Sequence, residues 1–271
     1  MYSIPKDAEK GFPLLQLQSQ YHNLNDLILA DDTKRHIVSI ILENQSSKDI
    51  LSYGLEPKCR ILFCGPPGTG KTLTAKVISS ALGYPFVHVM FDSVISSYLG
   101  ETATNLRSIF NFIEQDRFLV LFDEFDIVGK KRDDPHEHGE IKRVVNNFMQ
   151  MLDNSQNSSI LIAATNHQHL LDKAVWRRFD DIVYFDLPDT EQRELLFVKY
   201  LQVLKRNRGI NLSYLAEITS GYSAADIAQV CKDALKQCIL ERRKTVTASH
   251  VLHAIEEQRR RRRIIAGEDN E

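Results

Sequence analysis

The residues with the clearest chemistry are a lysine and a threonine at the end of a glycine-rich segment. Gly65-Pro66-Pro67-Gly68-Thr69-Gly70-Lys71-Thr72 fits the pattern G-x-x-x-x-G-K-[ST], after an apolar run and before a helical one, with Leu73 next. Such glycines let backbone amides turn inward around phosphate oxygens, and the helix start adds a positive dipole end. We expect Lys71 to reach the β- and γ-phosphates of ATP and Thr72 to hold Mg²⁺. A glycine-rich turn with an incidental lysine is the alternative.

Two adjacent acids supply the second half of this chemistry. Phe118 to Glu124 reads F-L-V-L-F-D-E, an apolar strand that ends in two carboxylates. Such a strand end lies beside the phosphate loop in sheets of this type. We expect Asp123 to complete the Mg²⁺ shell and Glu124 to orient and polarise the attacking water. The alternative is a solvated acidic strand end.

Composition limits the classes of protein. The 271 residues include 34 Lys and Arg against 36 Asp and Glu, and 43% are hydrophobic. This is a globular balance without the overall basic field that nucleic acid attracts. The first residues show no apolar leader, and the longest apolar stretches have strand length. We therefore expect a cytoplasmic protein without a membrane partner.

The order of the patterns predicts an α/β core followed by helices. Apolar runs that alternate with helical ones predict a five-stranded parallel sheet with helices on both faces, the P-loop NTPase arrangement. After residue 188 only helical patterns follow, which predicts a small all-helical lid domain, with Ser223 as a helix cap. The expected parts are a wrapping segment 1–49, the nucleotide-binding domain 50–187, the lid 188–263 and an acidic tail 264–271. The expected strands are Arg60–Gly65, Pro85–Met90, Phe118–Asp123, Ser159–Asn166 and Asp181–Leu187, and the core helices are Lys71–Leu82, Thr102–Gln115 and Glu140–Leu152.

Taken together, four segments resemble the motifs of the AAA subfamily of AAA+ ATPases. The similarity extends from about Asn25 to Arg263. The segments are, in order, Gly65–Thr72, Asp123-Glu124-Phe125-Asp126, Ala164-Thr165-Asn166 and Arg177-Arg178-Phe179-Asp180.

The resemblance implies roles for three further polar residues. Asn166 is similar to the first sensor, which hydrogen-bonds the attacking water or the γ-phosphate. Arg177 and Arg178 resemble arginine fingers that enter a neighbouring subunit's site, although many relatives separate the two arginines by two more residues. Which arginine dominates stays open. The alternative for both is a surface salt bridge with Asp180 or Asp181.

The resemblance also implies an adenine pocket. Gly221-Tyr222-Ser223-Ala224-Ala225-Asp226 is similar to the family's G-x-S-G-A-D segment, whose small residues touch the adenine and ribose. Gly221, Ala224 and Ala225 are thus expected at the nucleotide, with Ala224 where relatives usually have glycine. Asp26 and Ile28 occupy the place where the family covers the adenine, although apolar residues there also suit a core without nucleotide.

One segment points to what ATP drives. Tyr98-Leu99-Gly100, before the helix expected from Thr102, resembles the first pore loop of hexameric unfoldases, which grips an extended polypeptide. The alternative is a tyrosine packed on its own domain. The arginine run Arg259–Arg263 suits a solvated helix end that meets a neighbouring subunit better than a nucleic-acid site.

The sequence therefore predicts an ATPase with ATP and Mg²⁺ as cofactors. We expect a homo-oligomeric ring, a hexamer, that remodels or unfolds protein substrates through a central pore, with a separately encoded partner or protease as a further candidate. An ATP-dependent nucleic-acid loader or translocase is the alternative. An ATP-binding switch with little hydrolysis is a third interpretation, against which Glu124, Asn166 and the paired arginines argue.

Overall fold

The computed structural model describes residues 2–7, 11–19, 21–90, 94, 99–125, 135–155, 158–203, 205–206 and 209–267. The chain forms two compact units. The larger comprises Met1–Leu27, Asp31–Gly65 and Lys71–Phe185, and the smaller comprises Ile28–Ala30, Pro66–Gly70 and Asp186–Glu271. The phosphate-loop segment therefore contributes residues to both units.

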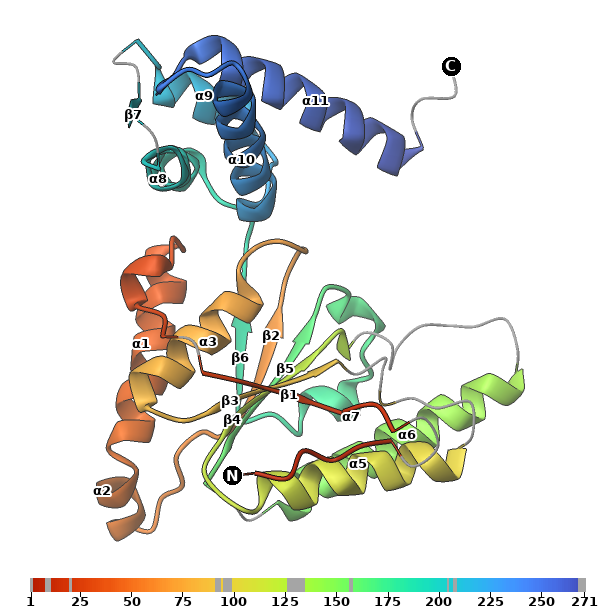
Figure 1. Cartoon of the computed structure of the whole chain (residues 1–271). Coiled ribbons are helices and arrows are strands. Elements are labelled where there is room, and N and C mark those ends of the chain that lie inside the picture. Colours follow the sequence, from red (N-terminus) through yellow and green to blue (C-terminus); the bar gives the residue numbers. More distant parts are fainter. Residues whose placement is uncertain are drawn as a thin grey trace. The chain divides into compact units, whose positions relative to one another are not determined.

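A six-stranded sheet forms the centre of the larger unit (Figure 1). Its order is β1-β3-β4-β5-β2-β6, and every neighbouring pair except β1–β3 is parallel. All parallel strands thus end at one edge of the sheet, which we call the carboxyl edge, and begin at the opposite, amino edge. The bounds are β1 Gln16–Gln18, β2 Arg60–Cys64, β3 Phe86–Met90, β4 Leu119–Asp123, β5 Ile160–Thr165 and β6 Asp181–Tyr184.

Helices cover both faces of this sheet. Successive side chains of a strand point to opposite faces, and nearly all side chains of the inner strands are buried. Leu62, Val120 and Leu161 belong to one hydrophobic cluster with side chains of α5 (Leu99–Ile113) and α6 (Pro135–Asn154). The alternating positions, such as Phe63 and Leu121, are equally buried, and α1 (Asp31–Gln45) and α3 (Lys71–Leu82) lie on the other side of the sheet from α5 and α6 (Figure 1). The predicted α/β fold is thus confirmed. Shorter elements of this unit are η1 Leu24–Asp26, α2 Ser47–Ser52, η3 Gln168–Leu170 and α7 Lys173–Trp176.

The prediction of five strands is wrong by one. Strand β1 adds an antiparallel edge to the sheet, with Leu17 opposite Val87 of β3. It lies in the N-terminal segment, where the sequence shows no strand pattern. Three residues of the type Gln-Leu-Gln are too few to produce a recognisable alternation. Pairing with the backbone of β3, rather than local sequence, makes this segment a strand.

Four helices build the smaller unit around their own core. They are α8 Thr190–Leu201, α9 Leu212–Ile218, α10 Ala224–Leu240 and α11 Ala248–Ala266. Phe197, Val230 and Val251 are completely or almost completely buried in this core. Ser223 caps α10 as predicted, since its hydroxyl accepts a hydrogen bond from the Asp226 backbone.

Some predicted boundaries in both units need correction. The smaller unit was expected to have no strand, but Lys205–Arg206 (β7) pairs in parallel with Thr245–Val246 (β8), and two residues give no periodic signal. Helix α5 begins at Leu99 rather than Thr102, so Leu99 and Gly100 belong to its first turn. No helix among the described residues is long and apolar enough to cross a bilayer.

Candidate active site

The glycine-rich segment links the end of β2 to the start of α3, as its pattern predicts. Gly65, Gly68 and Gly70 have φ angles of +137°, +76° and +103°, a region that side-chain-bearing residues rarely adopt. A Cβ atom on Gly65 would overlap the backbone carbonyl oxygen of Phe185. Within the loop, the Thr69 hydroxyl donates to the Pro66 carbonyl over 2.8 Å. The loop conformation therefore depends on glycine at defined positions.

Lys71 begins α3 and is held at the loop. Its side chain is buried, and Nζ donates to the carbonyl oxygen of Gly65 at 2.7 Å. The next residues, Thr72 and Leu73, are half-buried in the first turn of the helix. The Lys71 ammonium group therefore lies at the loop whose backbone N–H groups can bind phosphate oxygens. This is the position that the expected contact of Lys71 with the phosphates of ATP requires.

Thr72 and Asp123 come together from α3 and β4. The Thr72 hydroxyl donates to Asp123 Oδ2 at 3.0 Å, and the Glu124 backbone N–H donates to Asp123 Oδ1 at 3.0 Å. A hydroxyl and a carboxylate at this distance are the hard oxygen ligands that Mg²⁺ prefers. The two residues thus fit the expected metal ion.

The surroundings of Asp123 keep it ionised. Burial by itself would raise the pKa of this carboxyl, but hydrogen bonds from His88, Thr72 and the Glu124 N–H lower it below its ordinary value. His88 Nε2 lies 3.4 Å from Asp123 Oδ2. No motif in the sequence marks His88, whose only signal is a polar residue inside the otherwise apolar strand β3. His88 adds a second side-chain donor to the one that Thr72 provides.

Glu124 has the conformation of a strained functional residue. Its φ angle is +57°, in the left-handed region that costs a non-glycine residue about 1–3 kcal/mol. The residue is exposed directly after β4, so its carboxylate is open to solvent. This placement suits a group that orients a water molecule.

Asn166 directly follows β5 and is half-buried. Because β5 lies between β4 and β2 in the sheet, Asn166 reaches the carboxyl edge between the two acids and the start of the phosphate loop. The larger unit therefore brings Lys71, Thr72, Asp123, Glu124 and Asn166 to one edge.

Arg177 and Arg178 lie at the amino edge instead. They precede β6, and the Asp180 N–H donates to the carbonyl oxygen of Arg60, the first residue of β2. Gly65 directly follows β2 and is five residues beyond Arg60, a distance of about 16 Å at the roughly 3.3 Å rise per strand residue. The arginines are thus separated from their own phosphate loop by the length of a strand.

The expected alternative partners of these arginines are wrong. The Asp180 carboxylate accepts hydrogen bonds from the backbone N–H groups of Cys59 and Arg60. The Asp181 carboxylate accepts a hydrogen bond from Lys58 Nζ at 2.9 Å. Arg178 instead pairs with Asp153 near the end of α6.

Arg177 differs from its neighbour. Its side chain is exposed and makes no hydrogen bond or ion pair within the described part of the chain, although its backbone N–H donates to the Val175 carbonyl. Arg178 is also exposed but is held by the ion pair with Asp153.

The predicted adenine segment belongs to the smaller unit. Gly221 precedes the Ser223 cap, Ala224 and Ala225 open α10, and the Ala225 N–H donates to the Gly68 carbonyl at 3.0 Å. Ile28 packs against the core of this unit, in keeping with the alternative of an ordinary core position.

The remaining predicted site residues to be located are Asp26 and Tyr98. Asp26 lies in the larger unit, where its carboxylate accepts the Asn23 N–H at 2.9 Å in a capping box. Tyr98 lies outside the described residues.

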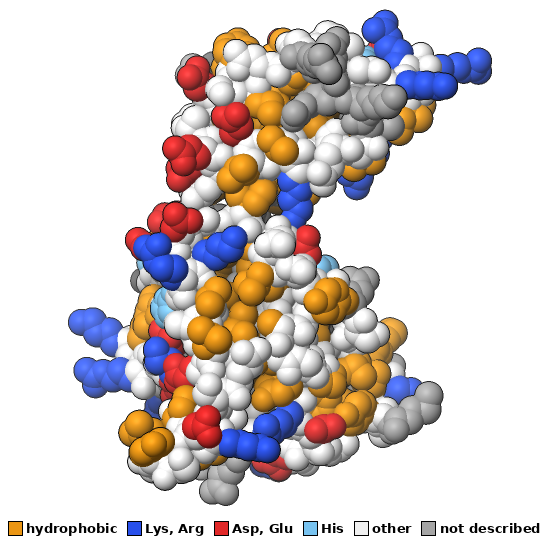
Figure 2. Space-filling view, turned by 90° about the vertical axis from the view of Figure 1, so that its left-hand side faces the viewer, with side chains coloured by type: hydrophobic (Ala, Val, Ile, Leu, Met, Phe, Trp, Pro, Cys, Tyr) orange, Lys and Arg blue, Asp and Glu red, His pale blue; other side chains and the backbone are white. Residues whose placement is uncertain are grey.

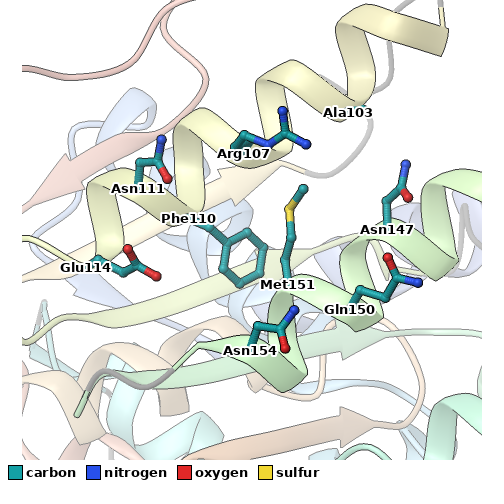
Figure 3. Close-up of a pocket in the computed structure, with 9 residues that line it drawn as sticks. All are labelled: Ala103, Arg107, Phe110, Asn111, Glu114, Asn147, Gln150, Met151 and Asn154. Atoms are coloured by element: carbon teal, nitrogen blue, oxygen red, sulfur yellow. The ribbon is translucent and has the colours of Figure 1, made fainter.

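A cavity of about 320 Å³ lies between α5 and α6, away from the predicted site residues. Figure 3 shows Phe110 and Met151 side by side between the two helices, with polar side chains around them. None of the predicted site residues lines this cavity.

Comparison with known proteins gives the same class as the site. The family model described as "ATPase family associated with various cellular activities (AAA)" matches residues 61–187, and the AAA+ lid domain matches residues 209–253. An uncharacterized AAA family ATPase, y4kL, of Sinorhizobium fredii is 40% identical over 243 residues, covering 89% of this chain and 72% of that protein. The chain therefore belongs to the AAA family of ATPases, as the sequence motifs predict.

Other relatives have a more specific name. The proteasome-activating nucleotidase of Saccharolobus solfataricus is 35% identical over 228 residues, covering 82% of this chain and 58% of the relative. That of Sulfurisphaera tokodaii is 34% identical over 256 residues, covering 91% of this chain and 64% of the relative. The chain thus spans roughly three fifths of the length of these two relatives.

Proposed function

We propose that this protein hydrolyses ATP as a ring-shaped homo-oligomer, a hexamer, and uses the energy to remodel or unfold protein substrates through a central pore. Lys71 binds the phosphates, Thr72 and Asp123 hold Mg²⁺, and Glu124 orients the attacking water beside Asn166. The metal ion neutralises charge on the phosphates when it is bound.

The position of the paired arginines supports this proposal most strongly. About 16 Å of strand separates them from the phosphate loop of their own chain, by the rise of β2. An arginine that stabilises the transferring phosphoryl group must contact that group, and it contributes roughly 10³–10⁵ in rate. Arg177 and Arg178 can act in this way only on another subunit. A groove of about 600 Å³ that Asp153, Arg60 and Asp180 help to line gives this edge a recessed surface for a neighbour.

The two arginines differ in freedom, which separates their proposed roles. Asp153 holds Arg178 within its own chain, whereas Arg177 has no such partner among the described residues. We therefore assign Arg177 as the finger that enters the neighbouring site first. Arg178 would follow only when its ion pair with Asp153 opens.

Protein substrates are favoured over nucleic acid. The relatives named proteasome-activating nucleotidase support protein substrates and a separately encoded protease partner. The triplet Tyr98-Leu99-Gly100, whose last two residues begin α5, has the aromatic–aliphatic–glycine pattern of a segment that grips polypeptide. On the face in Figure 2, side chains of both charge signs lie among apolar ones, in contrast to the positive surface that nucleic acid requires.

Mixed rings test the proposal directly. Glu124→Gln and Arg177→Ala chains are each expected to be inactive alone, because each lacks one half of every site. A mixture should regain activity, since some interfaces then combine an intact Glu124 with an intact Arg177. Steady-state phosphate release is measured against the mixing ratio. A mixture as inactive as its components would refute the assignment across subunits.

The substrate class needs a second measurement. ATPase rates are compared with an unfolded protein, with single-stranded DNA and without either, using Tyr98→Ala as the matched variant. We expect stimulation by the unfolded protein alone and its loss in Tyr98→Ala with the basal rate retained. Stimulation by DNA alone would instead favour the nucleic-acid alternative.

A further inference from the structure

The arginine run at the end of α11 is largely engaged within its own unit. Arg259 donates to the Ile218 carbonyl at 2.8 Å, and Arg261 lies 3.4 Å from an Asp233 carboxylate oxygen. Arg262 donates to the Gly221 carbonyl at 3.0 Å. Arg259 thus holds the last residue of α9, and Arg262 holds the turn between α9 and α10, where the segment expected at the adenine begins. The run therefore acts on the protein's own structure.

Arg262 makes the most contacts with this turn. Besides its bond to Gly221, its guanidinium lies over the ring of Tyr222, 4.6 Å from the centroid, and 4.0 Å from Asp226 Oδ2. Gln258, one helical turn earlier on α11, donates to Asp226 Oδ1 at 2.8 Å. Two side chains on one face of α11 thus contact Gly221 and Tyr222 of the turn and Asp226 in the first turn of α10.

The contacts continue from Asp226 to the phosphate loop. Asp226 Oδ2 accepts both the Ser223 N–H and the Ser223 hydroxyl at 2.9 Å. The neighbouring Ala225 N–H donates to the Gly68 carbonyl, and a Cβ added to Gly68 would lie 2.8 Å from the Ala225 Cβ. A continuous set of contacts therefore joins Arg262 to Gly68 inside one compact unit.

We propose that Arg262 is a positioning residue for nucleotide binding, which holds the turn Gly221–Asp226 against the phosphate loop so that both are preformed for the same ligand. A preformed site loses less freedom on binding than one that must be ordered first. The guanidinium suits this task because its planar fork can donate to Gly221 while its face covers Tyr222. This inference rests on the nucleotide site of the proposed function.

The test compares Arg262→Gln with Arg260→Gln. Both remove one positive charge from α11, but the Arg260 side chain is exposed and makes no hydrogen bond or ion pair in the described part of the chain. The dissociation constant of a fluorescent ADP analogue is measured on the full chain, with thermal unfolding of the nucleotide-free protein alongside. We expect Arg262→Gln to raise the constant about tenfold, equivalent to about 1.4 kcal/mol, and Arg260→Gln to leave it unchanged.

Further readouts separate positioning from a structural role. A positioning residue should raise KM with little change in kcat, since it affects ground state and transition state alike. Arg262→Lys keeps a cation and a donor and should recover part of the affinity, and it carries the same comparison should Arg262→Gln not fold. Unchanged nucleotide affinity in both Arg262 variants, with or without a lower melting temperature, would overturn the proposal.

The same titration distinguishes failure of the nucleotide site itself. Lys71→Ala should lose affinity because its cation is gone from the phosphate loop. If Lys71→Ala bound the analogue as tightly as the wild type, the proposed site would be wrong whatever Arg262 does. Normal dependence on Lys71 together with equal affinity in Arg262→Gln and Arg260→Gln would refute only the positioning role.

Discussion

Replacing Gly65 by alanine tests how closely the phosphate loop is built against the end of β6. The φ angle of +137° is unfavourable for alanine, and the new Cβ would overlap the Phe185 carbonyl oxygen and lie 3.0 Å from its carbonyl carbon. Phe185 cannot easily move away, because its N–H donates to the Cys64 carbonyl at 2.8 Å. Two penalties therefore act together, one from the backbone and one from overlap.

Their size follows from comparison with a glycine that has only the first penalty. Gly83 follows α3 in the same unit with a φ angle of +70°, and its added Cβ would meet nothing within 4 Å. Gly83→Ala should cost about 1–2 kcal/mol for left-handed backbone. Gly65→Ala should cost about 1–3 kcal/mol for strain and a further 1–3 kcal/mol for overlap. The free energy of unfolding should therefore fall clearly more in Gly65→Ala than in Gly83→Ala.

Urea unfolding followed by tryptophan fluorescence measures both variants. Trp176 is the single tryptophan of the chain and belongs to the larger unit, where it packs against the main hydrophobic cluster. Its signal therefore reports the unit that contains both glycines. Equal losses in Gly65→Ala and Gly83→Ala would refute the reasoning, because overlap with Phe185 would then contribute nothing.

Three further predictions follow from other parts of the larger unit. Phe148→Ala should lower the free energy of unfolding by about 3–5 kcal/mol in the same urea assay, since its ring contacts Phe110 and Phe122 in the core, and a loss below 1 kcal/mol would contradict that packing. Burial tends to raise the pKa of Asp181, but bonds from Lys58 and His36 lower it. Asp181→Asn should therefore lower the free energy of unfolding by about 1–2 kcal/mol at pH 7. The wild type should keep this whole advantage at pH values above the unfolded-state pKa of about 3.9. It should lose the advantage as the pH falls through the lower native-state pKa, because the carboxyl is then protonated in both states. The same difference at pH 2 and pH 7 would exclude this origin. Glu124→Gln should keep nucleotide affinity while phosphate release falls by orders of magnitude, and a rate near that of the wild type would show that Glu124 is not the water-orienting group.

Much of the fold could be predicted because its signals are local. The five parallel strands are apolar runs, and α3 begins at Lys71 and ends at Leu82 as expected from its pattern. The Ser223 cap could likewise be predicted, because it depends only on Ser223 and the first residues of the helix that follows it. Strand β1 could not be predicted, because three residues lack a pattern and become a strand only by pairing with β3. The two-residue ladder of β7 and β8 escaped for the same reason.

The sequence by itself determined the phosphate loop, its companion acids and the order of the elements, since spacing within a few residues specifies each of them. Only the tertiary structure decided which groups meet across long stretches of chain. His88 reaches Asp123 from 35 residues away, Arg178 reaches Asp153 from 25, and Arg262 reaches Gly221 from 41. These long-range contacts depend on the order of the strands in the sheet and on the packing of helix faces, which no local sequence pattern specifies. The arginine pair is at the amino edge of the sheet for the same reason, because the parallel register of β2 and β6, rather than the motif, places it there.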